Sequence, residues 1–151
     1  MPVALWLAGC TIEHGDVRTP SGEPPEADSV RVRETVEAIA AALEGGDLVA
    51  LDSIYHDSVL VYEGGGVDRG WAVYRDGHLR PELEALTDLR FRFDDIRVRL
   101  ADGTAWVTCR YALDALHDGQ AVSARGVATL VFRELGRRWR LVHIHTSSAR
   151  E

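Results

Sequence analysis

The stretch that decides the fold lies near the end of the chain and reads Trp139-Arg140-Leu141-Val142-His143-Ile144-His145-Thr146-Ser147. Polar and apolar residues alternate along it, and β-branched and aromatic residues are frequent, which predicts a β-strand. Because successive side chains of a strand point to opposite faces, the alternation places His143 and His145 on the same face as Trp139 and Leu141. We therefore expect a final strand that presents two imidazoles to one side of a sheet.

The segments before this strand begin with helices. Asp28-Ser29 can cap a helix whose apolar residues recur every three to four positions, and Gly45-Gly46 ends it. Asp47 then caps a shorter helix, and residues 58–62 form a short strand. The glycine run 64–66 is predicted to be a loop.

A third helical segment is predicted over residues 71–86, followed only by strands. Pro81 interrupts it, so we expect a break near Arg80, because the residue before a proline avoids the α region. From Thr87 onward the pattern is β, and its apolar phase slips at Asp94-Asp95, which predicts a β-bulge. Hairpin turns are expected at residues 101–103 and 117–120. The order of elements predicts an α+β fold with four long antiparallel strands.

The final strand also carries a family resemblance. Its Trp-x-hydrophobic-x-His-x-His-x-Ser pattern resembles the closing strand of the SnoaL-like, DUF4440-type branch of the NTF2-like superfamily. The resemblance covers about residues 30–148 and implies a cone, in which a curved antiparallel sheet wraps around N-terminal helices. It implies no single activity, because this fold hosts isomerases, cyclases, dehydratases, hydrolases and non-catalytic assembly domains.

Such a cone would enclose a pocket lined by the sheet and the helices, and this predicts a set of site residues. The candidate catalytic residues are Glu63, His78, His143 and His145. The candidate ligand-binding residues are Tyr62, Trp71, Tyr74 and Glu82. The segment from Glu63 to Glu82 also resembles a subgroup pattern within the DUF4440-type family, which implies the same pocket positions.

Three interpretations of these residues remain open. A desolvated Glu63 with a raised pKa would accept a proton while a histidine stabilises an enolate. Alternatively, Glu63, His78, His143 and His145 would bind a divalent metal, although no metal or organic cofactor is our main expectation. In the third interpretation the histidines only pack and form hydrogen bonds. The Asp and Tyr constellation of ketosteroid isomerases cannot be mapped onto the sequence.

Composition excludes some partners. The formal net charge is −7 and no run of basic residues occurs, which argues against a nucleic-acid surface. Residues 3–10 are apolar and end in Leu7-Ala8-Gly9-Cys10, which resembles the lipobox of bacterial lipoproteins and implies lipidation of Cys10. We therefore expect a lipoprotein signal over residues 1–10, a tether over 11–27 and the folded domain over 28–151. No basic residue precedes the apolar run, so a recorded start downstream of the true one, or a chance match in a cytoplasmic protein, stays open.

Two classes of function follow. The chain is expected to bind a small, largely apolar organic molecule at the cell envelope without an assigned reaction, or to be an enzyme with isomerase-, cyclase- or hydrolase-like acid/base chemistry. The His-x-His-x-Ser ending also resembles the association domain of calcium/calmodulin-dependent kinases, which favours binding or assembly. A homodimer is expected, with Val142 and Ile144 on the outer face of the sheet buried by the partner.

Overall fold

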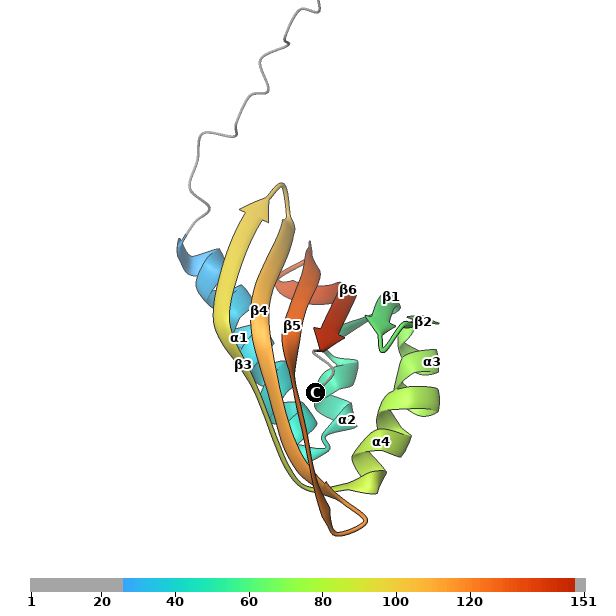
Figure 1. Ribbon diagram of the computed structural model, residues 1–151. Coiled ribbons are helices and arrows are strands. Elements are labelled where there is room, and N and C mark those ends of the chain that lie inside the picture. Colours follow the sequence, from blue (N-terminus) through green and yellow to red (C-terminus); the bar gives the residue numbers. More distant parts are fainter. Residues whose placement is uncertain (1–25, 149–151) are drawn as a thin grey trace, which may run out of the picture.

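The computed structural model describes residues 26–148, and Figure 1 shows how its elements are arranged. The predictions of a signal at 1–10 and of most of a tether at 11–27, including lipidation of Cys10, lie outside the described residues and stay predictions. The elements are α1 Glu26–Gly45, α2 Leu48–Asp52, β1 Tyr55–Glu63, β2 Gly66–Arg69, α3 Trp71–Tyr74, η1 Arg75–Leu79, α4 Arg80–Ala85, β3 Leu86–Ala101, β4 Thr104–His117, β5 Gln120–Leu135 and β6 Arg138–Ser148. In this part of the chain, no helix has the length and apolar character needed to cross a bilayer.

The strands form one six-stranded sheet in the order β2-β1-β6-β5-β4-β3. The sheet curls around α1, while α3 and α4 lie across the opening of the curve (Figure 1). This confirms the α+β cone. Two features were not predicted: β2, which forms a hairpin with β1 across the glycine run, and the parallel pairing of β1 with β6.

The two N-terminal helices begin and end much as predicted. Helix α1 starts at Glu26, two residues before the expected cap, and Gly46 follows it with a φ of 64°, the left-handed conformation that glycine adopts most easily. The Asp47 side chain accepts a hydrogen bond from the Ala50 backbone N–H and so caps α2. The turn between them packs both helices onto the sheet.

The segment from Trp71 to Ala85 stays helical, so the predicted break at Arg80 is wrong. A π-helical turn, η1, joins α3 to α4 and places Pro81 in the first turn of α4. A proline there removes no α-helical hydrogen bond, and the wider turn before it accommodates the ring. The helix therefore changes its winding instead of breaking.

The predicted bulge in β3 is confirmed. Pairing with β4 shifts between Asp94 and Arg97, and Asp95 has a φ of 51°. As a result Phe93, before the bulge, and Ile96, after it, both pack against the core.

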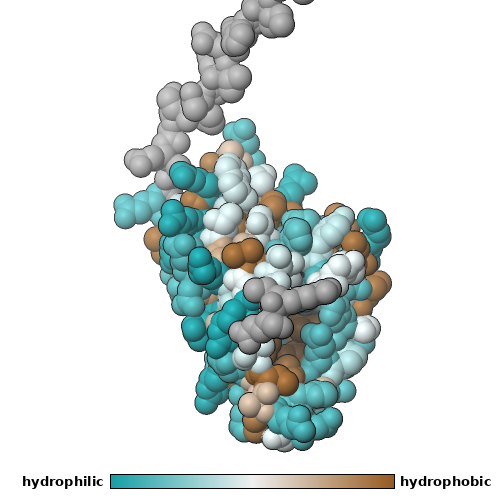
Figure 2. Space-filling model, in the orientation of Figure 1, coloured by the Kyte–Doolittle hydropathy of each residue, from teal (hydrophilic) through white to brown (hydrophobic). Residues whose placement is uncertain are grey.

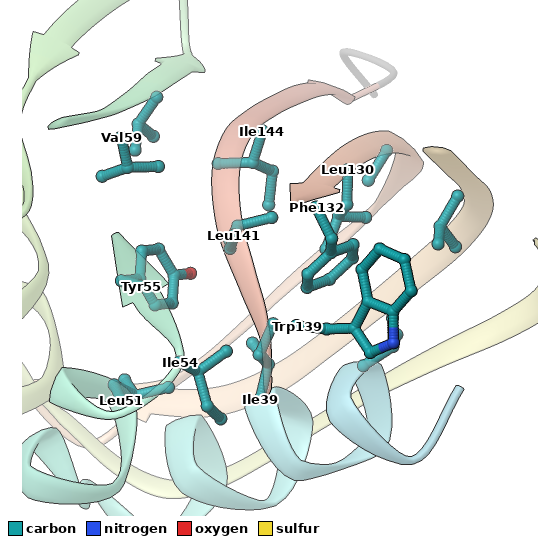
Figure 3. Packing of buried hydrophobic residues seen from close by; sticks show 14 of the residues in the cluster. Ile39, Leu51, Ile54, Tyr55, Val59, Leu130, Phe132, Trp139, Leu141 and Ile144 are labelled. Carbon is teal, nitrogen blue, oxygen red and sulfur yellow. The ribbon is translucent and has the colours of Figure 1, made fainter. Parts of the chain in front are cut away.

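A second bulge, in β6, was not predicted. It changes which face of the sheet the residues after Leu141 occupy. Pairing with β5 passes from Phe132↔Leu141 directly to Val131↔His143, which leaves Val142 without a partner on β5. Leu141 and Ile144 therefore both join the core (Figure 3). The prediction that Ile144 lies on the outer face is wrong, because the bulge inserts one extra residue into the alternation.

Candidate functional site

A cavity lies between the inner, concave face of the sheet and the α3–α4 segment. Its inner part has a volume of about 80 Å³, and its outer part, of about 720 Å³, opens to solvent. Figure 2 shows hydrophobic side chains in a hollow of this surface, with hydrophilic ones around it. The residues that line both parts are Glu63, Glu82, Leu86, Phe91, Tyr111, Leu113 and Thr146.

Glu63 is the central polar group of the cavity. It ends β1, and its parity places it on the inner face with the buried Val61. The Tyr74 hydroxyl donates to Glu63 Oε2 at 3.3 Å, and the Thr146 hydroxyl also bonds to this carboxyl. Burial raises the pKa of Glu63, and the charge of Glu82 raises it further, against the opposite effects of His78 and the two hydroxyls.

His78 lies behind the two glutamates, on the π-helical turn, and does not itself line the cavity. Its Nδ1 is 2.8 Å from Asp68 Oδ2, and its Nε2 is 3.3 Å from Glu82 Oε1 and 3.9 Å from Glu63 Oε2. Burial alone lowers the pKa of His78, but the bond to Asp68 and the charges of Glu82 and Glu63 outweigh it and raise the pKa overall. Asp68 was missed by sequence reasoning, because no element was predicted between the glycine run 64–66 and the helical segment that begins at Trp71.

The two aromatic residues of α3, Trp71 and Tyr74, have different positions relative to the cavity. Tyr74 lines the inner part, as predicted. Trp71 does not line the cavity: its ring stacks on Tyr55 with centroids 4.3 Å apart, and its Nε1 donates to Asp52 Oδ1 at 2.6 Å. Trp71 thus positions α3 against the end of α2 instead of contacting a ligand directly.

The structure separates the two C-terminal histidines from Glu63 and His78. After the bulge at Val142, His143 and His145 project to the outer face, where their rings lie 5.4 and 6.0 Å from the ring of Tyr62. The prediction that these imidazoles share the face of Leu141 is therefore wrong, and Tyr62 likewise points away from the cavity. His145 reaches only the rim of the outer part.

Because of this separation, Glu63, His78, His143 and His145 cannot bind one metal ion together, as one of the interpretations required. Glu63 and His78 meet on the inner side, whereas His143 and His145 lie on the other face of the sheet. Within residues 26–148, no group of three or more histidine, cysteine, aspartate or glutamate side chains has a metal-binding arrangement.

One cavity residue depends on a glycine that sequence reasoning also missed. Tyr111 on β4 pairs with Gly126 on β5, and a Cβ at Gly126 would lie 2.6 Å from the Tyr111 ring and 2.2 Å from the Ser147 carbonyl oxygen. The ring therefore lies over the glycine and reaches Ser148, which forms a hydrogen bond with its hydroxyl. No sequence motif marks this pair, and neither residue was among the predicted site residues.

The arrangement supplies the parts of an acid/base site. A carboxyl with a raised pKa lies where an apolar chamber meets an open mouth, and hydroxyls of Tyr74 and Thr146 hold it in place. An imidazole fixed by Asp68 lies on its other side. A group placed in this way can accept a proton from a bound molecule and return it.

Comparison with known proteins agrees with the fold. The sequence profile of the SnoaL-like domain matches residues 32–151, and no curated protein sequence matches the chain. A structure from Streptomyces avermitilis, described as a candidate dehydratase of the NTF2-like family, is 25% identical with a TM-score of 0.74, covering 84% of this chain and 100% of that chain.

Two further solved structures share the fold at lower identity. A type 2 hexachlorocyclohexane dehydrochlorinase is 12% identical with a TM-score of 0.73, covering 82% of this chain and 86% of that chain. The CaMKII hub of S. rosetta is 22% identical with a TM-score of 0.65, covering 80% and 95% respectively. The chain belongs to the SnoaL-like domain family of the NTF2-like superfamily.

Proposed function

We propose that the cavity binds a small, largely apolar organic molecule and that Glu63 exchanges a proton with it. The observation that carries the proposal is the position of Glu63, whose carboxyl is desolvated at the boundary between the apolar inner part and the open outer part of the cavity. A carboxyl with a raised pKa is a better proton acceptor than an ordinary one once it is ionised.

The apolar walls define the body of the ligand. The inner part is lined by aliphatic and aromatic side chains from α1, α4, β3 and β4, which favour hydrocarbon surface over charged groups. The carboxyl groups of Glu63 and Glu82 lie among the residues that line both parts, where the inner part meets the open outer part. A ligand would therefore place its apolar body inside and its reacting C–H bond beside Glu63.

His78 and Asp68 support this chemistry from behind the cavity wall. Asp68 fixes the imidazole through Nδ1, so that Nε2 faces Glu82 and Glu63. In this position His78 acts on the substrate only through the glutamates. We assign it a positioning role, together with Asp68.

The experiment is hydrogen–deuterium exchange of carbon acids, followed by NMR in D₂O with a panel of small cyclic ketones. The protein is expected to catalyse exchange at the carbon next to the carbonyl. Glu63→Gln should slow the catalysed rate by about 10²- to 10⁴-fold, the usual contribution of a general base. Glu84→Gln, an exposed residue on the same helical segment that does not line the cavity, should leave the rate unchanged.

Equal exchange rates for the wild type and Glu63→Gln would contradict the proton transfer. Saturable binding without exchange would favour the second candidate, a binding domain without turnover. The structural similarity to the CaMKII hub is the observation that supports this second candidate, a binding domain without turnover.

A further inference from the structure

The charged groups around the cavity are almost all of one sign. Glu63 and Glu82 line both of its parts, and no arginine among residues 26–148 lines either part. All seventeen basic residues of the chain are arginines, so no lysine is present to supply a positive charge. The outer part has two exposed histidines at its rim, His117 and His145.

The one imidazole in contact with the glutamates does not balance them. His78 faces Glu82 at 3.3 Å and Glu63 at 3.9 Å, and its other nitrogen is already bonded to Asp68. Three carboxylates thus surround one imidazole. When all four groups are ionised, this cluster has a net charge of 1 − 3 = −2.

Aromatic rings from β3 and β4 also line the cavity. Phe91 and Phe93 from β3 line the inner part, with ring centroids 5.0 Å apart, and Phe91 stacks on Tyr111 at 6.2 Å. The face of an aromatic ring has negative potential and attracts organic cations. Carboxylates and aromatic rings in one cavity are the surroundings that an alkylammonium group prefers.

We infer that the ligand of this cavity is an organic ammonium ion with a small apolar body. The ammonium group lies beside Glu82 and Glu63, and the hydrocarbon body enters the inner part between the aromatic rings. Carboxylates and phosphates are disfavoured, because no arginine of the described residues lines the cavity to compensate for their charge. The inference rests on the proposed function and names the substrate class of the same site.

The net charge of the whole chain also favours the binding of a cation. The net charge of −7 attracts cations toward the protein, and the cavity mouth concentrates two of the carboxylates. Glu82 is 57% exposed at its side chain, so it meets an incoming ligand before Glu63, which is 35% exposed. We therefore assign the first contact with the ammonium group to Glu82.

The test compares three ligands of one shape and different charge: benzylammonium, benzyl alcohol and benzoate, with affinities measured by ligand-observed NMR titration. Benzylammonium is expected to bind about tenfold more tightly than the alcohol, and benzoate more weakly than either. Glu82→Gln should weaken the ammonium about three- to fivefold, in line with a half-exposed ion pair, and leave the alcohol unchanged. Glu84→Gln makes the same change of charge on the same helix outside the cavity and should alter none of the three.

The outcomes separate this inference from the proposed function. If the alcohol binds as tightly as the ammonium in the wild type and Glu82→Gln changes neither affinity, the charge preference is overturned while the apolar pocket stands. If none of the three ligands binds to the wild type, or if Leu113→Trp, which fills the shared wall of the cavity, leaves their affinities unchanged, the pocket itself is overturned. Tight ammonium binding that is lost in Leu113→Trp supports both the pocket and its preference for a positive charge.

Discussion

At the scale of single residues, Glu63 links the stability of the protein to pH. Its pKa is raised above the ordinary value of 4.5, so the folded state holds this proton more tightly than the unfolded state does. The unfolding free energy therefore falls as the pH rises from about 4.5 through the folded-state pKa, because ionised Glu63 is better solvated in the unfolded chain. Above that window the cost of the buried charge is fully present.

Glu63→Gln should for this reason be more stable than the wild type at pH 7. Because the side chain is about one third exposed, the gain is expected to stay below about 1 kcal/mol. The difference between the two proteins should shrink as the pH approaches 4.5, which urea denaturation at several pH values measures. A variant less stable than the wild type at pH 7 would show that the hydrogen bonds from Tyr74 and Thr146 to the carboxylate outweigh its desolvation.

At the scale of elements, Asp52 fastens the cavity-lining helical segment to the rest of the fold. Its Oδ1 accepts from Trp71 Nε1 at 2.6 Å and from Arg75 Nη1 at 2.9 Å, and so joins the end of α2 to α3 and η1. Trp71 is only 5% exposed, so its N–H has no ready access to water if this acceptor is lost. The clamp therefore supports the turn that carries Tyr74 and His78.

Asp52→Ala is expected to destabilise the protein by about 1–3 kcal/mol, the usual cost of a buried donor left unpaired. In a Trp71→Phe background the same substitution should cost less, because the indole N–H is already absent. Chemical denaturation of the four proteins of this cycle gives the coupling energy. Equal costs of Asp52→Ala in both backgrounds would assign its effect to Arg75 alone.

The elements also show what the sequence could and could not predict. The bulge of β3 was predictable, because the apolar residues on either side of Asp94-Asp95 change phase. The bulge of β6 was not, because Val142, His143 and Ile144 are all acceptable on either face of a strand. The one extra residue turns His143 and His145 to the outer face of the sheet, whereas Glu63, Tyr74 and Glu82 line the cavity.

At the scale of the whole molecule, the outer face of the sheet retains apolar surface. Trp106 on β4 is 41% exposed and Val127 on β5 is 53% exposed, and both alternate with buried residues. We propose that a second copy of the chain covers this face. Ile144 has no part in such an interface, because it belongs to the core.

A dimer is therefore expected at micromolar concentration, and light scattering coupled to size-exclusion chromatography measures its mass. Trp106→Arg combined with Val127→Glu should yield a monomer that still folds, because both side chains are exposed in the single chain. Val49→Glu is the control, since Val49 is 78% exposed on α2, away from the sheet. A wild-type monomer would contradict the proposal.

The order of strands in the sheet determines when the sheet can form during folding. Strand β6 lies between β1 and β5, so it holds the N-terminal hairpin and the long meander together. Of the described strands it is the last that the ribosome releases, and until then β1 has no neighbour on that side. Synthesis must thus deliver nearly the whole domain before its sheet can close, and loss of this one strand would divide the sheet into two pieces and remove Thr146, the hydrogen-bond partner of Glu63.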